Sequence, residues 1–487
     1  MSNSNAPVAE KSGEYKINSL ETRSNHDNIN LALKQAICWA IMFGVGENSF
    51  SLFAHHLNAP VAFYSALVWI PAFLGPFIQI IAANLLDHYQ TRVKMVYIAC
   101  FIQALSFVPL VMVAYWSKDL DYSATRGMTI YLYLFLLSLL LYHMSGSFAS
   151  PPWQSFVGDL VSQDQRGRFF AKFTRAISIV SLTCQLLLWL TFFLVAFYLN
   201  NSYVVLSIVF SSVFFISYVS RCFSVLILTK IIEPHYQASS NTKFSFWQFI
   251  KRARESNFVK FVFFISVLHC GANISAPYFL LYWLDDLKYS SSQWIILASA
   301  GSISAIITLL VWGRFSDLFG NKKTMTYCAF LISITPFLWL VSDNMYYLIT
   351  LQIIAMTFWT GLNLSSMNYI YEAASPPKRA RCFAYFSVIT GGGVLLGTQI
   401  GLFISTHIPK NLFNLDFKSS FCWVLIASGL VRLLACCLFL PLFKELREVK
   451  PFKTNTLFVD VIKLNSIWDT NFFKNDEISK NKDEKND

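Results

Sequence analysis

Apolar segments of membrane-spanning length recur through this chain, and they restrict its fold more than any other feature. A helix needs roughly 20 apolar residues to cross the hydrocarbon core of a bilayer, and segments of that length follow one another almost from end to end. In lipid, every backbone N–H and C=O must find a partner within the structure, which a helix provides inside each segment. Only 13% of the residues are charged, whereas a soluble domain usually has about 25%. We therefore predict an all-α integral membrane protein.

Twelve apolar segments are divided into two sets of six by one polar, basic connection. The predicted spans are 32–57, 61–86, 95–116, 128–150, 171–199 and 203–230, and then 258–284, 292–312, 324–342, 345–370, 383–406 and 419–443. We expect an N-terminal six-helix bundle at 31–230, a linker at 231–256 and a C-terminal bundle at 257–443. The polar ends, 1–30 and 444–487, predict disordered tails. The first tail has no apolar core or cleavage site of the kind found in a removable signal peptide.

The distribution of Lys and Arg predicts that both ends of the chain lie in the cytosol. With that orientation, the outer loops hold few basic residues, namely Lys118, Arg126, Lys288, Lys410 and Lys418. Most others fall on the cytosolic side, among them Arg166, Arg168, Lys251, Arg252, Arg254, Lys322, Lys323, Lys378, Arg379 and Arg381. The net charge of +11 has the same origin. Because the charges are scattered at span ends, nucleic-acid binding is disfavoured. We also expect the protein to be a monomer in the inner or plasma membrane.

The sequence has no sign of a metal site, a cofactor site or a soluble-type enzyme. Its ten cysteines lie mostly within apolar segments, and none forms a CxxC pair or a Cys/His set with metal spacing. Cysteines of this kind usually behave as small buried hydrophobes. A nucleophile elbow, a phosphate-binding glycine loop and a zinc signature are absent from the sequence. No cofactor and no enzymatic activity are therefore predicted.

A charged turn occurs once in each half of the chain. In the second half, GRFSDLFGNKK (313–323) puts a glycine, an acid, a second glycine and two lysines between two apolar segments. A weaker copy, ANLLDHYQTRVK (83–94), lies in the first half. The matched charged residues are Asp87, Arg92 and Lys94 in the first half and Asp317, Lys322 and Lys323 in the second.

Two further landmarks repeat in the same order. Each half has an acid followed nine residues later by an arginine, the pairs being Asp159 with Arg168 and Glu372 with Arg381. Each half also closes with an arginine in its last apolar segment and a glutamate-containing run after it, Arg221 before KIIEP and Arg432 before KELRE. Three matched landmarks in one order indicate an internal repeat. We expect a structural role for the arginines of this last landmark.

The six-plus-six layout with GRFSDLFGNKK resembles the major facilitator superfamily of secondary transporters. The likeness covers about residues 32–445. The second-half turn matches the loop signature of that family through Gly313, Asp317, Gly320, Lys322 and Lys323. In the first half, Ala83 and Gln90 stand where the family usually has glycines. The resemblance implies a central substrate cavity between two six-helix halves, exposed alternately to each side of the membrane.

The same resemblance implies that the charged turns form a cytosolic gate. An acid at a span end can pair with a cation or face a helix amino terminus, and such contacts can form in one conformation and break in the other. The expected gate residues are Asp87, Arg92, Asp159, Arg168, Gly313, Arg314, Asp317, Lys322, Glu372 and Arg381. The alternative is that these charges only anchor the spans at the interface.

Polar residues inside the spans indicate the expected substrate path, because they are costly in lipid and usually face a cavity. Glu47, in GVGENSF within the first span, is the leading candidate for proton coupling, and His143 and His269 are assigned the same role. In the superfamily, spans one, four, seven and ten line the cavity. By that analogy, the expected substrate contacts are Asn48, Asn273, Tyr278, Trp359, Asn363 and Asn368. The alternative for each is a structural hydrogen bond between helices.

Glycines and prolines within two spans predict close helix approach or bends. They are Pro71, Gly75 and Pro76 in the second span and Gly391, Gly392, Gly393 and Gly397 in the eleventh.

Three classes of function fit this sequence. The first is a proton-coupled carrier for a small polar organic solute, with the solute, protons and the bilayer as its only expected partners. The second is an efflux carrier for apolar or cationic compounds that works as a proton antiporter, and it would also place an acid in the first span. The third is a non-transporting sensor or lipid handler, for which both tails look too short and too polar.

Overall fold

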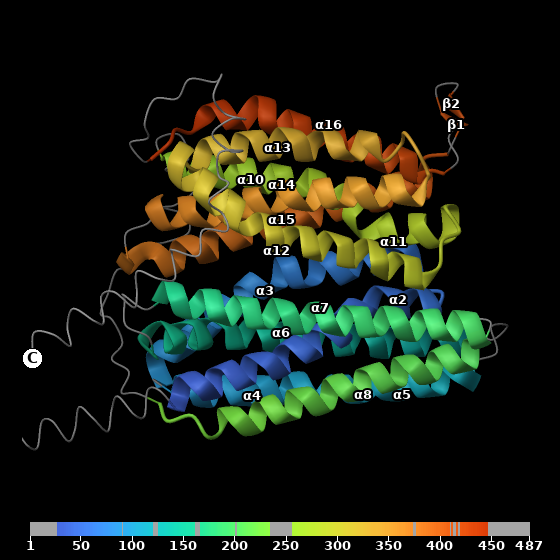
Figure 1. The fold of residues 1–487 in the computed structure, drawn as a ribbon, viewed down its shortest axis with the longest axis horizontal. Helices are drawn as coiled ribbons and strands as arrows, with labels where there is room; N and C mark the ends of the chain where they lie inside the picture. Colours follow the sequence, from blue (N-terminus) through green and yellow to red (C-terminus); the bar gives the residue numbers. More distant parts are fainter. Residues whose placement is uncertain are drawn as a thin grey trace, which may run out of the picture.

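The computed structural model describes residues 27–89, 91–119, 125–160, 166–199, 202–233, 256–373, 376–409, 411–412, 415–416 and 419–446. Most of the two predicted tails and of the predicted linker lies outside these residues. Within them the chain is almost wholly helical (Figure 1). The predicted fold class, a helical membrane protein, is confirmed.

The first half has six helical segments. The first span, Asp27–His56, ends with the 3-10 turn η1 (Glu47–Ser49) and helix α2 (Phe50–His56). Helices α4 (Arg92–Leu105) and α5 (Phe107–Trp116) follow one another in the third span, which closes with η2 (Ser117–Asp119). The other spans are single helices, α3 (Val61–Tyr89), α6 (Thr125–Leu160), α7 (Arg166–Leu199) and α8 (Tyr203–Leu228).

The second half repeats this plan. Its first span joins α10 (Asn257–Ser275), η4 (Ala276–Tyr278), α11 (Phe279–Leu281) and a π-helical turn, η5 (Tyr282–Asp286). Single helices follow, α12 (Ser291–Phe319), α13 (Asn321–Leu338), α14 (Met345–Ala373) and α15 (Pro376–His407). The last span is α16 (Phe421–Phe439) with η6 (Leu440–Leu442).

Eleven helical segments of the described chain are long and apolar enough to cross a membrane. They match every predicted span except 324–342. That place is taken by α13, which has 18 residues and begins Asn-Lys-Lys. These three polar residues lower the mean hydropathy of the helix below that of the other spans. Because α13 packs against α14 and α16 inside the bundle, we count it as the twelfth helix of the fold.

One small element departs from the all-α prediction. Strands β1 (Asn411–Leu412) and β2 (Leu415–Asp416) pair antiparallel in the connection between α15 and α16. They lie at the end of the bundle opposite the end of α16 (Figure 1). We call that end the distal side, and we call the end at which Asp27 and Leu442 lie the terminal side. The Lys and Arg distribution predicts that the terminal side is cytosolic.

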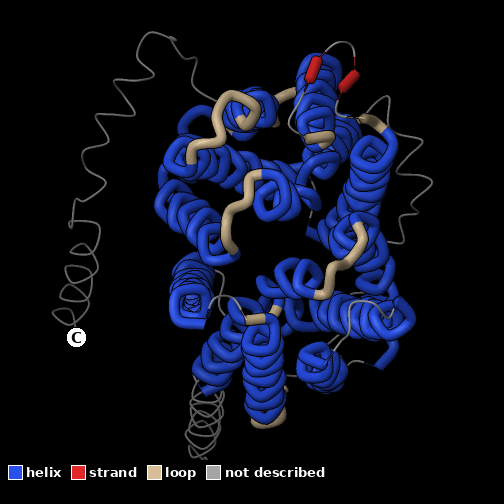
Figure 2. Tube along the Cα trace, turned by 90° about the vertical axis from the view of Figure 1, so that its right-hand side faces the viewer, coloured by secondary structure: helices blue, strands red, loops and turns tan. Residues whose placement is uncertain are grey.

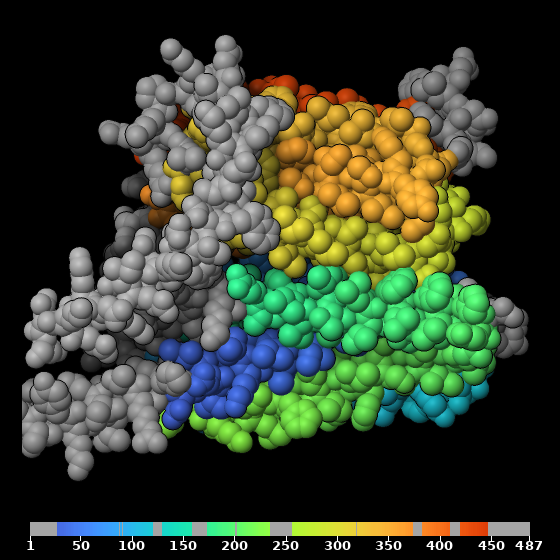
Figure 3. All heavy atoms as spheres, viewed as in Figure 1, coloured from blue at the N-terminus to red at the C-terminus, as the bar shows by residue number. Residues whose placement is uncertain are grey.

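The helices run along one axis and form two lobes. The first-half helices, blue to green, lie beside the second-half helices, yellow to red (Figures 1 and 3). Figure 2 looks along the helices from the distal side, where the strands face the viewer. The lobes meet mainly where α3 packs on α15 and α7 packs on α12. Each half therefore gives two helices to the contact.

Two neighbouring helices approach α15 closely at positions where α15 has glycine, because glycine has no side chain to keep them apart. A Cβ at Gly397 would lie 2.1 Å from the carbonyl oxygen of Cys270 on α10. On another face, a Cβ at Gly391 would lie 2.1 Å from the carbonyl oxygen of Ala72 on α3. The close helix approach predicted for this span is confirmed, and α15 lies between α10 of its own half and α3 of the other.

Candidate functional site

A cavity of about 460 Å³ lies among the helices of the first half. Many of its wall residues are polar, although they come from membrane-spanning helices. The residues lining it are Gln35, Ala36, Trp39, Glu47, Gln79, Val96, Cys100, Gln103, Tyr142, His143, Gly146, Ser147, Ala149, Ser150, Trp153, Phe173, Ile177 and Arg221. All eighteen belong to the first half. The cavity therefore has the amphipathic wall expected of a binding site for a small molecule.

Glu47 enters this cavity where the first span is interrupted. The α-helix of that span gives way at Gly46 to the 3-10 turn η1, whose first residue is Glu47. A Cβ at Gly46 would lie 2.5 Å from Ser217 Oγ and 3.0 Å from the Phe107 ring, so only glycine fits between these helices. The interruption lets neighbouring spans close around the carboxylate, which lines the cavity.

The Glu47 carboxylate has a fixed partner across the cavity. Tyr142 on α6 donates a hydrogen bond from Oη to Glu47 Oε2 at 2.5 Å. The Tyr142 ring is held edge-on by Phe50 and Phe107, each at a centroid separation of 5.4 Å. His143 follows Tyr142 on α6 and also lines the cavity. Two of the three residues predicted for proton coupling therefore lie on the wall of one cavity.

The predicted second-half residues lie elsewhere. The ring of His269 on α10 is 5.7 Å from that of Trp359 on α14, and Asn273 donates to the His269 carbonyl at 2.8 Å. Tyr278 is buried and donates to the Thr398 carbonyl on α15 at 2.8 Å, so its hydroxyl links two helices. On α14, Asn363 is exposed and Asn368 is half-buried. None of these residues lines the first-half cavity.

The first-half asparagine of the predicted set also has a local partner. Asn48 is exposed, and its amide donates to the Gly44 carbonyl one turn earlier in the same span at 3.2 Å. It is not among the residues that line the cavity.

Sequence reasoning missed the glutamines and the arginine of this wall. Gln35, Gln79 and Gln103 line the cavity, and the Gln103 amide donates to the Tyr142 carbonyl at 3.1 Å. Arg221, for which we expected a structural role, lines it as well. The sequence did contain a signal for these four residues, because each is a polar side chain within a membrane span. The sequence did not show which of the many polar residues in the spans shared one wall.

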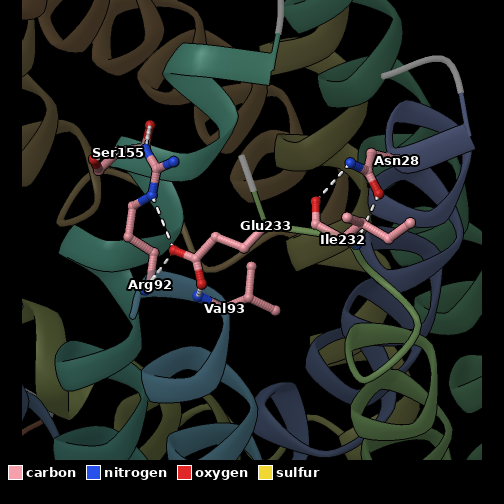
Figure 4. Close-up of polar contacts among 6 residues, drawn as sticks. All are labelled: Asn28, Arg92, Val93, Ser155, Ile232 and Glu233. Atoms are coloured by element: carbon pink, nitrogen blue, oxygen red, sulfur yellow. Dashed lines mark hydrogen bonds and ion pairs between the residues drawn. The ribbon is translucent and has the colours of Figure 1, made fainter. Parts of the chain in front are cut away.

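On the terminal side, the expected gate residue Arg92 is held by Glu233 (Figure 4). The Arg92 guanidinium nitrogen Nε lies 3.3 Å from Glu233 Oε1. The backbone N–H groups of Arg92 and Val93 donate to the two oxygens of the same carboxylate at 2.6 and 3.2 Å. These N–H groups belong to the first turn of α4, where helices favour a negative charge. Glu233 is the glutamate of KIIEP and therefore caps α4.

The second half contains the same arrangement. The carboxylate of Glu445, from the KELRE run, accepts from the backbone N–H of Lys322 at 2.7 Å in the first turn of α13. Beside it, the Asn321 amide donates to Glu372 Oε1 at 2.8 Å and also accepts from Ser316 Oγ. Glu233 and Glu445 were not among the predicted gate residues, although both stood in the third repeated landmark. Their equivalent contacts extend the internal repeat from sequence to structure.

The second-half turn depends on the conformation of one glycine. Gly320 has φ 90° and ψ 156°, a region that residues with a Cβ rarely adopt. It joins α12 directly to α13. Before it, Gly313, Arg314 and Asp317 lie in the last turns of α12, with Arg314 and Asp317 exposed. The side chains of Asp87, Asp159, Arg168 and Arg381, which were also predicted for the gate, lie outside the described residues.

Replacing Glu233 by glutamine should destabilise the first half. A glutamine keeps the size of the side chain but not the charge, so contacts worth about 1 to 2 kcal/mol at a helix terminus are lost. Thermal unfolding of the purified protein checks this expectation. Glu445→Gln is the matched variant in the second half and should lower the midpoint similarly. An unchanged midpoint in both variants would show that neither carboxylate acts as a cap.

Polar contacts among the described residues join the two halves toward the distal side. His55 Nε2 lies 3.0 Å from Asp285 Oδ1, linking the ends of the first span and of η5. Ser302 on α12 donates to Gln185 on α7 at 3.3 Å, and Gln399 on α15 donates to Ser65 on α3 at 3.5 Å. All lie in the distal portion of their helices. They hold the lobes together on the side opposite the charged turns.

Two pseudo-equivalent helical lobes, charged turns on one side and a polar cavity within the membrane define the class of this molecule. It is a multi-pass integral membrane protein with the fold of secondary transporters. The family model described as Major Facilitator Superfamily matches residues 261–473. The second half of the chain therefore matches this family model, in agreement with the resemblance carried by its charged turn.

Relatives and solved structures agree with this fold. The chain is 26% identical over 144 residues to the quinolone resistance protein NorA of Staphylococcus aureus (strain MRSA252), a match that covers 29% of this chain and 37% of NorA. The nucleoside transporter NupG is similar in structure with a TM-score of 0.59 at 14% identity, over 86% of this chain and 99% of NupG. A bacterial homologue of the iron transporter ferroportin, in its inward-facing state, gives a TM-score of 0.63 at 11% identity, over 86% of this chain and 98% of that protein.

Proposed function

We propose that this protein is a secondary active transporter that moves a small organic solute by alternating access and couples that movement to protons. The observation that carries the proposal is the Glu47 carboxylate, bonded to Tyr142 on the wall of a polar cavity within the membrane. An ionisable group at membrane depth is costly, and its usual role is in a substrate or proton pathway.

The arrangement of the lobes supports a mechanism. Ionised Glu47 is a negative charge within the membrane, and a proton neutralises it. The ionised carboxylate favours a cavity that is open to water, and the protonated one tolerates a closed cavity. The lobes meet along α3 with α15 and α7 with α12, and the His55–Asp285 pair joins them distally. Movement across these contacts would expose the cavity to one side and then to the other.

A second candidate is efflux of organic cations or apolar compounds in exchange for protons. Aromatic side chains line the same cavity as Glu47, namely Trp39, Trp153 and Phe173. An aromatic wall with one carboxylate can hold an organic cation through cation–π attraction and charge. The partial likeness to NorA, whose name refers to quinolone resistance, agrees with this alternative.

Proton movement in proteoliposomes tests both candidates. The full-length protein is reconstituted with a trapped pH-sensitive dye, and groups of candidate solutes are added outside. A comparison of metabolites in cells with and without the protein selects these solutes. A symporter acidifies the lumen when its solute is added outside. An antiporter makes the lumen more alkaline, because protons leave as its solute enters. A solute that crosses without any pH change would reject proton coupling, and no crossing by any solute would reject transport.

The gate carries a separate prediction at Asp317. Replacing it by asparagine should impair transport while leaving expression intact, because the contacts of this carboxylate are proposed to favour one conformation. Losing about 1 to 2 kcal/mol in one state shifts the ratio of the two states roughly 5- to 30-fold. Initial uptake rates, normalised to the amount of protein in the membrane, measure the effect. Wild-type kinetics in this variant would leave Asp317 with an anchoring role only.

A further inference from the structure

We propose that the cavity binds its solute through an oxyanion, a carboxylate or a phosphate, and that Arg221 supplies the positive charge. This inference rests on the proposed transport function and names the chemical class of the solute. Arg221 lies in α8, has 3% of its surface exposed and lines the cavity that Glu47 enters.

The polar partners of Arg221 leave its charge uncompensated. One terminal nitrogen donates to Ser224 Oγ at 3.1 Å and the other to Cys100 Sγ at 2.9 Å. Ser224 Oγ also accepts from the Gln35 amide at 3.3 Å, so that hydroxyl is shared between two donors. Arg221 Nε has no hydrogen-bond partner among the described residues. No carboxylate of the described chain lies within ion-pair distance of the guanidinium.

The equivalent arginine of the second half provides a comparison. Arg432 lies in α16 and is likewise buried, with 5% of its surface exposed. Its terminal nitrogens donate to the carbonyl oxygens of Ile332 and Ala272 at 3.1 and 3.4 Å, and to Ser275 Oγ at 3.3 Å. Its stem also packs on Gly271, where a Cβ would lie 2.9 Å from Arg432 Cγ. The Nε of Arg432, like that of Arg221, has no hydrogen-bond partner among the described residues. The backbone carbonyls, however, give its terminal nitrogens acceptors that those of Arg221 lack, so Arg432 fits the structural role expected for both arginines.

A counter-charge would stabilise Arg221 in its buried position. A guanidinium does not lose its proton in proteins, so Arg221 cannot become neutral as a buried histidine or lysine can. A buried cation is costly unless it is paired and hydrogen-bonded. A carboxylate or phosphate can satisfy the charge and accept two parallel N–H bonds. The cavity beside Arg221 is the place from which such a group can arrive.

The charges of the cavity wall match proton-coupled binding of an anion. Glu47 is the acidic residue among those that line the cavity, and Arg221 is the arginine among them. In a proton-coupled cycle, Glu47 is neutral when it holds the proton. The wall then has a net positive charge at Arg221, and an oxyanion balances it. The same charge repels an organic cation, which disfavours the efflux alternative.

Binding to the purified full-length protein in detergent tests this assignment without requiring transport. Thermal unfolding and the fluorescence of Trp39 and Trp153, which line the cavity, report binding at constant ionic strength. The probes are lactate, succinate and glycerol 3-phosphate, each paired with a neutral analogue, methyl lactate, dimethyl succinate and glycerol. Tetraphenylphosphonium serves as the organic cation. At least one oxyanion should bind, and roughly 30-fold or more tightly than its neutral analogue, because an unpaired buried charge costs several kcal/mol. The carboxylates and the phosphate distinguish the two sources of the oxyanion.

Arginine variants locate the effect. In Arg221→Gln, the preference for acid over neutral analogue should disappear, whereas Arg432→Lys should keep it. If Arg221→Gln does not fold, the comparison of each oxyanion with its neutral analogue on the wild-type protein still tests the proposal. The proposal is overturned if neutral analogues bind as tightly as acids, if Arg221→Gln keeps the preference, or if no oxyanion binds. Proton movement driven by a neutral or cationic solute, without oxyanion binding, would overturn this inference and leave the transport proposal intact.

Discussion

Replacing Glu47 by glutamine is expected to abolish solute accumulation driven by a pH gradient. One proton per solute gives about 1.4 kcal/mol per pH unit, which is roughly a tenfold accumulation. Glutamine keeps the shape of Glu47 and can still meet Tyr142, but it cannot bind and release a proton. Accumulation should therefore fall to a ratio of about one, while downhill exchange of solute across the membrane continues. The measurement is the inside-to-outside solute ratio in proteoliposomes at several imposed gradients.

Two control variants narrow the interpretation of this result. Glu47→Asp keeps an ionisable group and should retain part of the accumulation. Tyr142→Phe removes the 2.5 Å hydrogen bond but leaves the carboxylate, so coupling should persist with a changed pH dependence. Undiminished accumulation in Glu47→Gln would assign the proton to another residue, with His143 on the same wall as the first alternative.

Replacing Gly397 by alanine is expected to destabilise the second half strongly. The added Cβ would lie 2.1 Å from the Cys270 carbonyl oxygen, with the Cys270 backbone carbon at 2.9 Å. These are backbone atoms, so α10 and α15 must move apart rather than adjust a side chain. Overpacking of this kind costs about 1 to 3 kcal/mol, and small residues are what allow such helix approach in membranes. The thermal unfolding midpoint and the yield of monodisperse protein measure the loss.

The same helix offers a matched control at Gly392. A Cβ there would meet no atom within 4 Å, and alanine is preferred to glycine within a helix by roughly 0.5 to 1 kcal/mol. Gly392→Ala should therefore be neutral or slightly stabilising. Equal behaviour of the two alanine variants would contradict the close contact between α10 and α15.

The sequence predicted the class of fold and the positions of the spans. Apolar length is a local property, and a helix satisfies its own backbone in lipid, so each span could be located without knowledge of its neighbours. The helix at the predicted span 324–342 is α13, which begins with Asn321, Lys322 and Lys323 ahead of that span and is the helix of the twelve that falls below the composition of a typical span. The charged turns and their repeat are also local patterns, and they indicated the superfamily without any knowledge of how the helices pack.

The membership of the site depended on the tertiary structure. A hydrophobic pattern does not fix the rotation of a helix whose faces are all apolar, so the sequence could not tell that Tyr278 bonds to the Thr398 carbonyl and that Arg221 lines the cavity. The contact of Glu233 with Arg92, 141 residues apart, likewise arises only when the end of α8 packs beside the start of α4. By itself, the sequence determined which segments enter the membrane, because burial in lipid acts on each segment separately. Only the packing of those segments decided which polar side chains meet, because that depends on distances between helices that are remote in the chain.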